Sequence, residues 1–250
     1  MRKLIRACFM ALSIFSIVPV RFRHVKWDDN AIRYLLTFYP VIGLLLGVIW
    51  LGMGWLFQYN AFHPWIGGAL LLAAPHVFSG FLHLDGFMDV MDAALSHRSR
   101  EEKLRILKDS HTGAFAVISF GLFLVLSFGC MVVFLERHKN PLLLLFLPVI
   151  SRSLCALLLL CGKTLPTSSM GSYFKTGAGK PQVIVLVLML LIGIAGACWL
   201  ASGVWMAVGQ LVAFGFMAWI CYRQFGGVSG DVAGCCLVVC EGAGMLMAAL

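Results

Sequence analysis

Three of the eleven acidic residues lie close together, in a segment over residues 83–92 that reads HLDGFMDVMD. A helix turns by about 100° per residue and would place Asp85, Asp89 and Asp92 on one stripe. Carboxylates at this spacing repel one another, and a divalent cation removes the repulsion. Because oxygen ligands that leave room for water and phosphate oxygens suit Mg²⁺, the segment predicts a magnesium site for a phosphate-linked substrate. The alternative is the solvated face of an amphipathic helix.

Basic side chains follow the aspartates directly. They are Arg98, Arg100, Lys103, Arg105 and Lys108. Arginine can hold a phosphate through two hydrogen bonds, and lysine neutralises its charge, so the segment could hold a diphosphate. The alternative, which applies above all to Arg100 and Lys103, is the ordinary excess of positive charge in the cytoplasmic loops of membrane proteins.

Two histidines flank this region and are the nearest candidates for proton transfer. His83 precedes the aspartates and His111 follows the basic segment. An imidazole titrates near neutral pH, which suits a general base. A structural hydrogen-bonding role is the alternative for each of them.

A glycine-rich turn over residues 226–234, which reads GGVSGDVAG, is the third candidate feature. Such a turn at the start of a helix presents backbone N–H groups to an anion. Asp231 within it would repel that anion unless a metal ion lay between them, so the turn and the aspartate together suggest a metal–phosphate site. The alternative is a packing turn with Asp231 as the helix cap.

The composition indicates where these residues must be held. Hydrophobic residues make up 61% of the 250 residues and charged residues 12%, and the mean hydropathy is +0.93. A soluble protein carries about 25% charged residues, so this chain lacks the charge to cover a surface in water. The composition excludes a disordered chain, a collagen, a disulfide-stapled secreted domain and an ordinary cytosolic enzyme. The surrounding solvent is lipid.

We predict an all-α fold: a polytopic helical bundle that forms one membrane-embedded domain over residues 1–250. A spanning helix needs about 20 mostly apolar residues. Seven stretches qualify: 35–57, 64–83, 112–135, 141–162, 181–201, 203–222 and 231–250. The stretch from Leu4 to Val20 is shorter and contains Arg6, so we expect it to lie in the interface or to be re-entrant.

The distribution of charge predicts the orientation. One set of loops holds thirteen Lys and Arg residues, whereas the opposite loops hold only Arg137 and Lys139. The basic loops are 21–34, 84–111, 163–180 and 223–230. The positive-inside rule makes them cytoplasmic, so the aspartates and the glycine-rich turn would face the cytoplasm.

Two charges are predicted inside the membrane. At 1.5 Å per residue, Arg152 lies about 17 Å from the outer edge and Glu241 about 15 Å from the inner edge. In an apolar core about 30 Å thick these depths nearly coincide. Because either charge alone would be costly there, we predict an ion pair between them.

Taken together, these motifs resemble the cobalamin synthase family, adenosylcobinamide-GDP ribazoletransferase. The resemblance rests on residues 83–86 (HLDG) with Asp89 and Asp92, on Lys108 and Asp109 with Gly113, and on residues 226–234 with Glu241. Residues 15–20 (FSIVPV) and 39–43 (YPVIG) agree with it. It extends over most of the chain, although Ala93 and His111 stand where Gly and Arg are frequent in the family. The second departure weakens any requirement for His111 as a base.

The resemblance implies a reaction and assigns roles. The family joins adenosylcobinamide-GDP to α-ribazole or its 5′-phosphate, releases GMP and requires Mg²⁺, as the last step of nucleotide loop assembly in cobalamin biosynthesis. The implied metal ligands are Asp85, Asp89, Asp92 and Asp231. The implied substrate contacts are Arg98, Arg105, Lys108, Asp109, Gly227, Gly230 and Asp231. The proton acceptor stays open between His83, one of the aspartates and His111.

Two other functions remain alternatives on the residues alone. One is a CDP-alcohol-type membrane phosphotransferase, whose aspartate spacing is similar but whose motif has no place for the glycine-rich turn. The other is an ion-coupled transporter that uses Arg152, Asp231 and Glu241 as a pathway. The partners we expect are the corrinoid nucleotide, the α-ribazole substrate and the lipid bilayer of the bacterial inner membrane. We expect no nucleic acid as a partner, and a homo-oligomer is compatible with the sequence.

Overall fold

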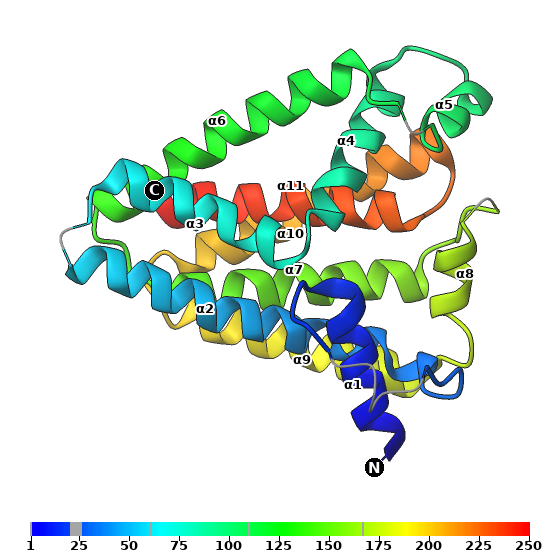
Figure 1. The fold of residues 1–250 in the computed structure, drawn as a ribbon, viewed down its shortest axis with the longest axis horizontal. Helices are drawn as coiled ribbons and strands as arrows, with labels where there is room; N and C mark the ends of the chain where they lie inside the picture. The colour runs from blue at the N-terminus through cyan, green and yellow to red at the C-terminus, as the bar shows by residue number, and fades with distance from the viewer. Residues whose placement is uncertain (1, 21–26, 61, 110, 167) are drawn as a thin grey trace.

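The computed structural model of the protein describes residues 2–20, 27–60, 62–109, 111–166 and 168–250 (Figure 1). Within these ranges the chain folds into helices and loops, and its only extended pairing is an isolated bridge between Thr164 and Val228. The helices are α1 (Arg2–Phe15), η2 (Ile32–Tyr34), η3 (Leu36–Phe38), α2 (Tyr39–Tyr59), α3 (Pro64–Phe78), α4 (Leu82–Leu95), α5 (Arg100–Ile106), α6 (Ala114–Glu136), α7 (Leu142–Cys161), α8 (Ser169–Phe174), α9 (Lys180–Cys198), α10 (Gly203–Phe225) and α11 (Gly230–Ala249). The predicted all-α class is confirmed.

Six helical segments among the described residues are long and apolar enough to cross a membrane. They comprise Ile32–Tyr59, which contains α2, together with α6, α7, α9, α10 and α11. Most of them run side by side along the long axis of the molecule, with α6 inclined to the others (Figure 1). The chain is therefore a multi-pass membrane protein, as predicted.

The predicted span over residues 64–83 is wrong as a continuous helix. Helix α3 has only 15 residues and is about 22 Å long, shorter than an apolar core of about 30 Å. The chain then bends by 91° into α4, so a seventh span exists only if α3 and α4 are counted together.

The bend has a local cause. Pro75 lies inside α3, and the backbone turns left-handed at Gly80 (φ 60°) and Phe81 (φ 62°), where a helix cannot continue. Ser79 Oγ donates a hydrogen bond to the Pro75 carbonyl at 3.0 Å and so satisfies one of the last carbonyls of α3. The bend sends α4 across the end of the bundle that also carries α5 (Figure 1).

Close packing of α2 on α7 holds the centre of the bundle together. A Cβ at Gly43 would lie 2.5 Å from the Pro148 carbonyl oxygen, and Gly47 lies equally tightly against the backbone of Leu145. Small residues at four-residue spacing let two helices approach closely in lipid. Gly43 and Gly47 therefore form a packing motif between α2 and α7.

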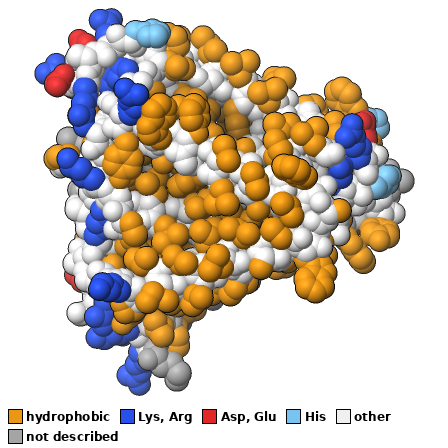
Figure 2. Space-filling view, turned by 180° about the vertical axis from the view of Figure 1, so that it is seen from behind, with side chains coloured by type: hydrophobic (Ala, Val, Ile, Leu, Met, Phe, Trp, Pro, Cys, Tyr) orange, Lys and Arg blue, Asp and Glu red, His pale blue; other side chains and the backbone are white. Residues whose placement is uncertain are grey.

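The surface has the charge distribution of a membrane protein. In Figure 2, Lys and Arg side chains gather along one edge, and a broad apolar surface separates them from a smaller charged group at the other end. Three of the basic residues used to predict orientation, at positions 21, 23 and 26, lie outside the described residues.

Helix α1 is amphipathic and too short to span. Its 14 residues measure about 21 Å, less than the thickness of an apolar core. Ala7, Met10 and Ala11 are buried against the bundle, whereas Leu4 and Ile5 are about half exposed. This agrees with the predicted interfacial or re-entrant segment.

Candidate active site

The three aspartates of the predicted stripe lie on one face of α4. Asp85 is exposed, and Asp89 and Asp92 are half-buried. Six other residues of α4 provide its buried face: His83, Leu84, Gly86, Phe87, Val90 and Ala93. The helical period therefore acts as predicted and holds the carboxylates together on the outer face of α4.

Asp231 reaches the same place from α11. A Cβ at Gly86 of α4 would lie 2.8 Å from the Cα of Asp231, so the two helices touch backbone to backbone. The chain begins α11 at Gly230, where Ser229 Oγ accepts a hydrogen bond from the N–H of Val232 at 3.2 Å. Ser229 Oγ also donates to the Asp231 carboxylate at 3.2 Å. The capping role that one interpretation gave to Asp231 thus belongs to Ser229.

Asp89 is close enough to the other three carboxylates to be affected by their charge. Asp89 lies outside the six spanning helices, and partial burial followed by repulsion from Asp85, Asp231 and Asp92 raises its pKa to about 6. Each of the other three predicted metal ligands therefore acts on Asp89. A bound cation would offset both the burial and the repulsion and favour the charged form.

Asp92 has an additional neighbour. Its carboxylate lies directly against Gly113, the residue that precedes the first turn of α6. The N-terminus of a helix carries partial positive charge, which stabilises an adjacent carboxylate. The N-terminal end of α6 therefore lies where it can favour the negative charge of Asp92.

The donor set fits a magnesium ion that is shared with a substrate. Among the described residues, no three His, Cys, Asp or Glu side chains are close enough together to enclose a metal ion by themselves. Mg²⁺ commonly uses one or two carboxylates and completes its octahedron with water and phosphate oxygens. The carboxylates of α4 and α11, which affect one another's charge, are of the kind that such partial coordination needs.

Two of the basic residues are structural. Arg100 Nε and Nη2 donate to the Phe225 carbonyl at 2.9 and 2.7 Å and so cap the end of α10. The buried Lys103 Nζ donates to the Ala94 carbonyl at 3.1 Å and to Gln224 Oε1 at 2.5 Å. These two side chains tie α5 to the ends of α4 and α10. This structural role is neither the phosphate binding nor the cytoplasmic loop charge that the sequence suggested.

The other basic residues are available to a ligand. Arg98, Arg105 and Lys108 are exposed, and none forms an ion pair with another described residue. Asp109 is exposed and accepts hydrogen bonds from the N–H and Nδ1 of His111 at 3.0 and 2.7 Å, which lower its pKa. It does not join the carboxylate group around Asp89, so its substrate contact stays a prediction.

The glycine-rich turn is partly occupied by the protein itself. The N–H of Val228 donates to the Lys163 carbonyl at 2.7 Å, and a Cβ at Gly227 would lie 2.8 Å from the same oxygen. At Gly230, by contrast, a Cβ would meet nothing within 4 Å. Open space for a ligand therefore lies at Gly230, and Gly227 packs against the 163–165 segment.

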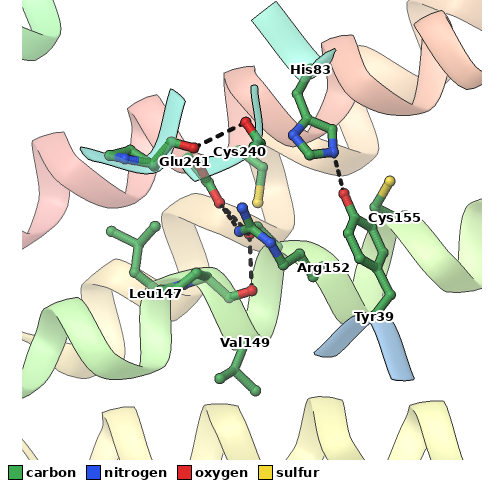
Figure 3. Close-up of polar contacts among 12 residues, drawn as sticks. Tyr39, His83, Leu147, Val149, Arg152, Cys155, Cys240 and Glu241 are labelled. Atoms are coloured by element: carbon green, nitrogen blue, oxygen red, sulfur yellow. Dashed lines mark hydrogen bonds and ion pairs between the residues drawn. The ribbon is translucent and has the colours of Figure 1, made fainter. Parts of the chain in front are cut away.

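His83 points away from the aspartates. A separation of two residues puts it about 200° around α4 from Asp85. Its buried Nε2 shares a hydrogen bond with the Tyr39 hydroxyl at the start of α2 (Figure 3). The structure does not bring His83 and the carboxylates together, and the sequence analysis missed its partner Tyr39. The Tyr39–Pro40 pair marks the start of α2 in the sequence, but it gives no sign that Tyr39 contacts His83.

The predicted ion pair inside the bundle is confirmed. Arg152 Nη1 lies 2.6 Å from Glu241 Oε1, and both side chains are fully buried (Figure 3). Ser151 Oγ also donates to the same oxygen at 2.7 Å. The pair joins α7 to α11 in the buried interior of the bundle. Each charge needs a partner there because the dielectric is low.

Comparison with known proteins identifies the family. The profile described as cobalamin-5-phosphate synthase matches residues 7–249. The chain belongs to the cobalamin-5-phosphate synthase family. A relative from Clostridium botulinum (strain Alaska E43 / Type E3), named adenosylcobinamide-GDP ribazoletransferase, is 41% identical over 252 residues, which cover 100% of this chain and 99% of the relative.

Other cobalamin-5-phosphate synthase relatives extend the likeness. Proteins with the same name from Clostridium perfringens (strain SM101 / Type A) and Geobacillus thermodenitrificans (strain NG80-2) are 36% and 31% identical. They cover 97% and 94% of this chain, and 96% and 91% of their own length. No solved structure matches the chain. The family suggested by the motifs is thus confirmed over the whole chain, in preference to a CDP-alcohol phosphotransferase or a transporter.

Proposed function

We propose that this protein is an Mg²⁺-dependent adenosylcobinamide-GDP ribazoletransferase. It joins adenosylcobinamide-GDP to α-ribazole or its 5′-phosphate, forms adenosylcobalamin or its 5′-phosphate, and releases GMP. The observation that carries this proposal is the full-length likeness to relatives with that name, up to 41% identical. The facing carboxylates of α4 and α11 support it, because a diphosphate transfer needs its charge neutralised at one place.

Each group of residues contributes a separate task. One or two at a time of the carboxylates of Asp85, Asp89, Asp92 and Asp231 would hold Mg²⁺, which supplies charge neutralisation for the diphosphate when bound. Arg98, Arg105 and Lys108 are exposed near these carboxylates in sequence and would hold the diphosphate, including the phosphate that leaves with GMP. Gly230 leaves open backbone beside Asp231 for the substrate to approach.

The hydroxyl that attacks the diphosphate must lose a proton. One of the four aspartates that Mg²⁺ leaves free would accept it, because this ion commonly binds only one or two carboxylates. His83 is less suited, because its ring points into the bundle and is engaged by Tyr39. His111 is exposed and paired with Asp109, away from the carboxylate group.

The proposed setting is the bacterial inner membrane, with the site facing the cytoplasm. The support is the charge distribution: the loops at the end of the bundle with α4, α5 and the glycine-rich turn carry most of the Lys and Arg residues. Cytoplasmic loops of membrane proteins carry such an excess. A nucleotide substrate made in the cytoplasm would reach the site directly from that side.

The direct test is GMP release from adenosylcobinamide-GDP by the purified protein in liposomes. The assay is run with and without α-ribazole 5′-phosphate, and with Mg²⁺ present or chelated. We expect release only when both are present, and a corrinoid product of matching amount. The absence of GMP from well-folded preparations would contradict the proposed substrate, and release that persists under chelation would contradict the metal.

A further inference from the structure

A cavity of about 430 Å³ lies between α3, α4 and α6. Its walls are almost entirely apolar and include Leu72, Leu84, Phe120 and Phe128. Val125, which is 70% exposed, lines its outer side, so the cavity opens toward the membrane. A cavity of this size falls within the range of small-molecule sites.

One polar side chain lines this cavity. His76 near the end of α3 is only 5% exposed, and its Nε2 has no hydrogen-bond partner among the described residues. Its ring is held edge-on to Phe123 of α6, with centroids 5.8 Å apart. A buried polar atom without a partner is costly, whereas a ligand that provides a hydrogen bond removes that cost. The cavity is therefore suited to a largely apolar ligand that carries a polar group.

The cavity adjoins the carboxylates. Phe81 lines it at the bend between α3 and α4, and the N–H of Asp85 donates to the Phe81 carbonyl at 2.9 Å. Residues four apart lie on the same helix face, one turn or about 5.4 Å along the axis. A ligand in the cavity would therefore reach the exposed carboxylate of Asp85 within about one helical turn.

We infer that this cavity receives one edge of the corrin ring of the substrate, with His76 hydrogen bonded to a peripheral amide. The inference rests on the proposed function and adds a binding site for the part of the substrate remote from the diphosphate. A corrin edge combines methyl groups with amide arms, which matches an apolar wall with a single buried imidazole. The acyl chain of a lipid would fill the walls but leave His76 unpaired.

The test measures binding of adenosylcobinamide, which lacks the GDP, to the protein in liposomes by equilibrium dialysis and corrin absorbance. His76→Phe removes the hydrogen bond, and Ala73→Phe fills the cavity from α3. We expect each to weaken binding about tenfold, a loss typical of one buried hydrogen bond or a blocked contact. Each should raise KM for adenosylcobinamide-GDP similarly and leave kcat and KM for α-ribazole 5′-phosphate within about twofold.

The matched control is Ala195→Phe, which adds the same ring at an exposed position of α9 outside the cavity and should change nothing. Ala69→Phe is a second filling variant if Ala73→Phe fails to fold. Equal binding by wild type and folded variants would overturn the proposal. The proposal would also be overturned by a phospholipid that copurifies with the wild type, is absent from the cavity-filling variants, and prevents binding of adenosylcobinamide. Failure of GMP release would count against the proposed function alone, because the binding assay needs no turnover.

Discussion

Gly86 of α4 lies directly against the backbone of Asp231 of α11: a Cβ at position 86 would sit 2.8 Å from the Asp231 Cα. This contact brings together the carboxylates of α4 and α11, although the nearest of them in the chain, Asp92 and Asp231, are 139 positions apart. The site therefore depends on a residue that carries no functional group. Because Gly86 has no Cβ, α4 and α11 can approach closely enough to bring their carboxylates together.

Gly86→Ala should separate α4 from α11. We expect activity to fall at least tenfold and the protein to lose about 1–3 kcal/mol of stability, because backbone atoms cannot move aside as a flexible side chain can. GMP release and thermal unfolding in detergent measure the two effects. Gly121→Ala in α6, where a Cβ meets nothing within 4 Å, is the control and should be neutral. Full activity of Gly86→Ala would show that the contact does not position the site.

Asp89→Asn should abolish turnover, by at least about a hundredfold, while the protein still inserts and folds. Asp89 is the carboxylate on which the other three act, and the amide removes both a negative charge and a proton acceptor. GMP release at saturating Mg²⁺ checks the result. Glu101→Gln, an exposed acidic residue in the first turn of α5, controls for charge alone. Retained activity in Asp89→Asn would refute its assignment to the metal site.

Lys103→Met should affect stability, whereas Arg105→Ala should affect substrate binding, although the two residues are only two positions apart on α5. Lys103→Met leaves the Ala94 carbonyl and Gln224 without their donor and should cost about 1–3 kcal/mol of stability. Arg105→Ala should leave stability unchanged and raise KM for adenosylcobinamide-GDP about tenfold, through one lost phosphate contact. Unfolding temperature and KM, measured on both variants, separate the roles. A raised KM for Lys103→Met with normal stability would instead assign that lysine to the substrate.

Arg152→Met should destabilise the protein by about 3–5 kcal/mol, because it leaves Glu241 buried without a countercharge. Adding Glu241→Leu should recover most of that loss, since an apolar pair of similar volume avoids both desolvation costs. Thermal unfolding of the two variants and the wild type makes the comparison. If the double variant were no more stable than Arg152→Met, the two charges would stabilise the protein through contacts other than their own ion pair.

Much of the site could be predicted from residues close together in the chain. The stripe of Asp85, Asp89 and Asp92 follows from the helical period alone, and α4 has that period. The pairing of Arg152 with Glu241 could also be predicted, because membrane thickness and helix rise place both at one depth. In each case a regular property of the α-helix, its turn or its rise per residue, converts sequence spacing into position.

Other features could not be predicted in this way. The break that turns residues 64–83 into two helices lies in an apolar segment, and hydropathy does not distinguish a straight helix from a bent one. The helical period turns His83 away from the aspartates, but its partner Tyr39 lies on another helix and does not follow from any spacing within α4. Arg100 and Lys103 have the same sequence pattern as Arg105, and only their contacts with the end of α10 separate them.

The sequence by itself determined the membrane fold class, six of the seven predicted spans, the charge asymmetry and the family, because these depend on composition, local period and motif order. The tertiary structure decided which carboxylates meet, which basic residues are structural, and where a cavity adjoins the site, lined by His76, whose Nε2 has no hydrogen-bond partner among the described residues. Those properties depend on the approach of helices far apart in the chain. That approach is set by backbone contacts such as Gly86 with Asp231, and the spacing along one helix carries no information about it.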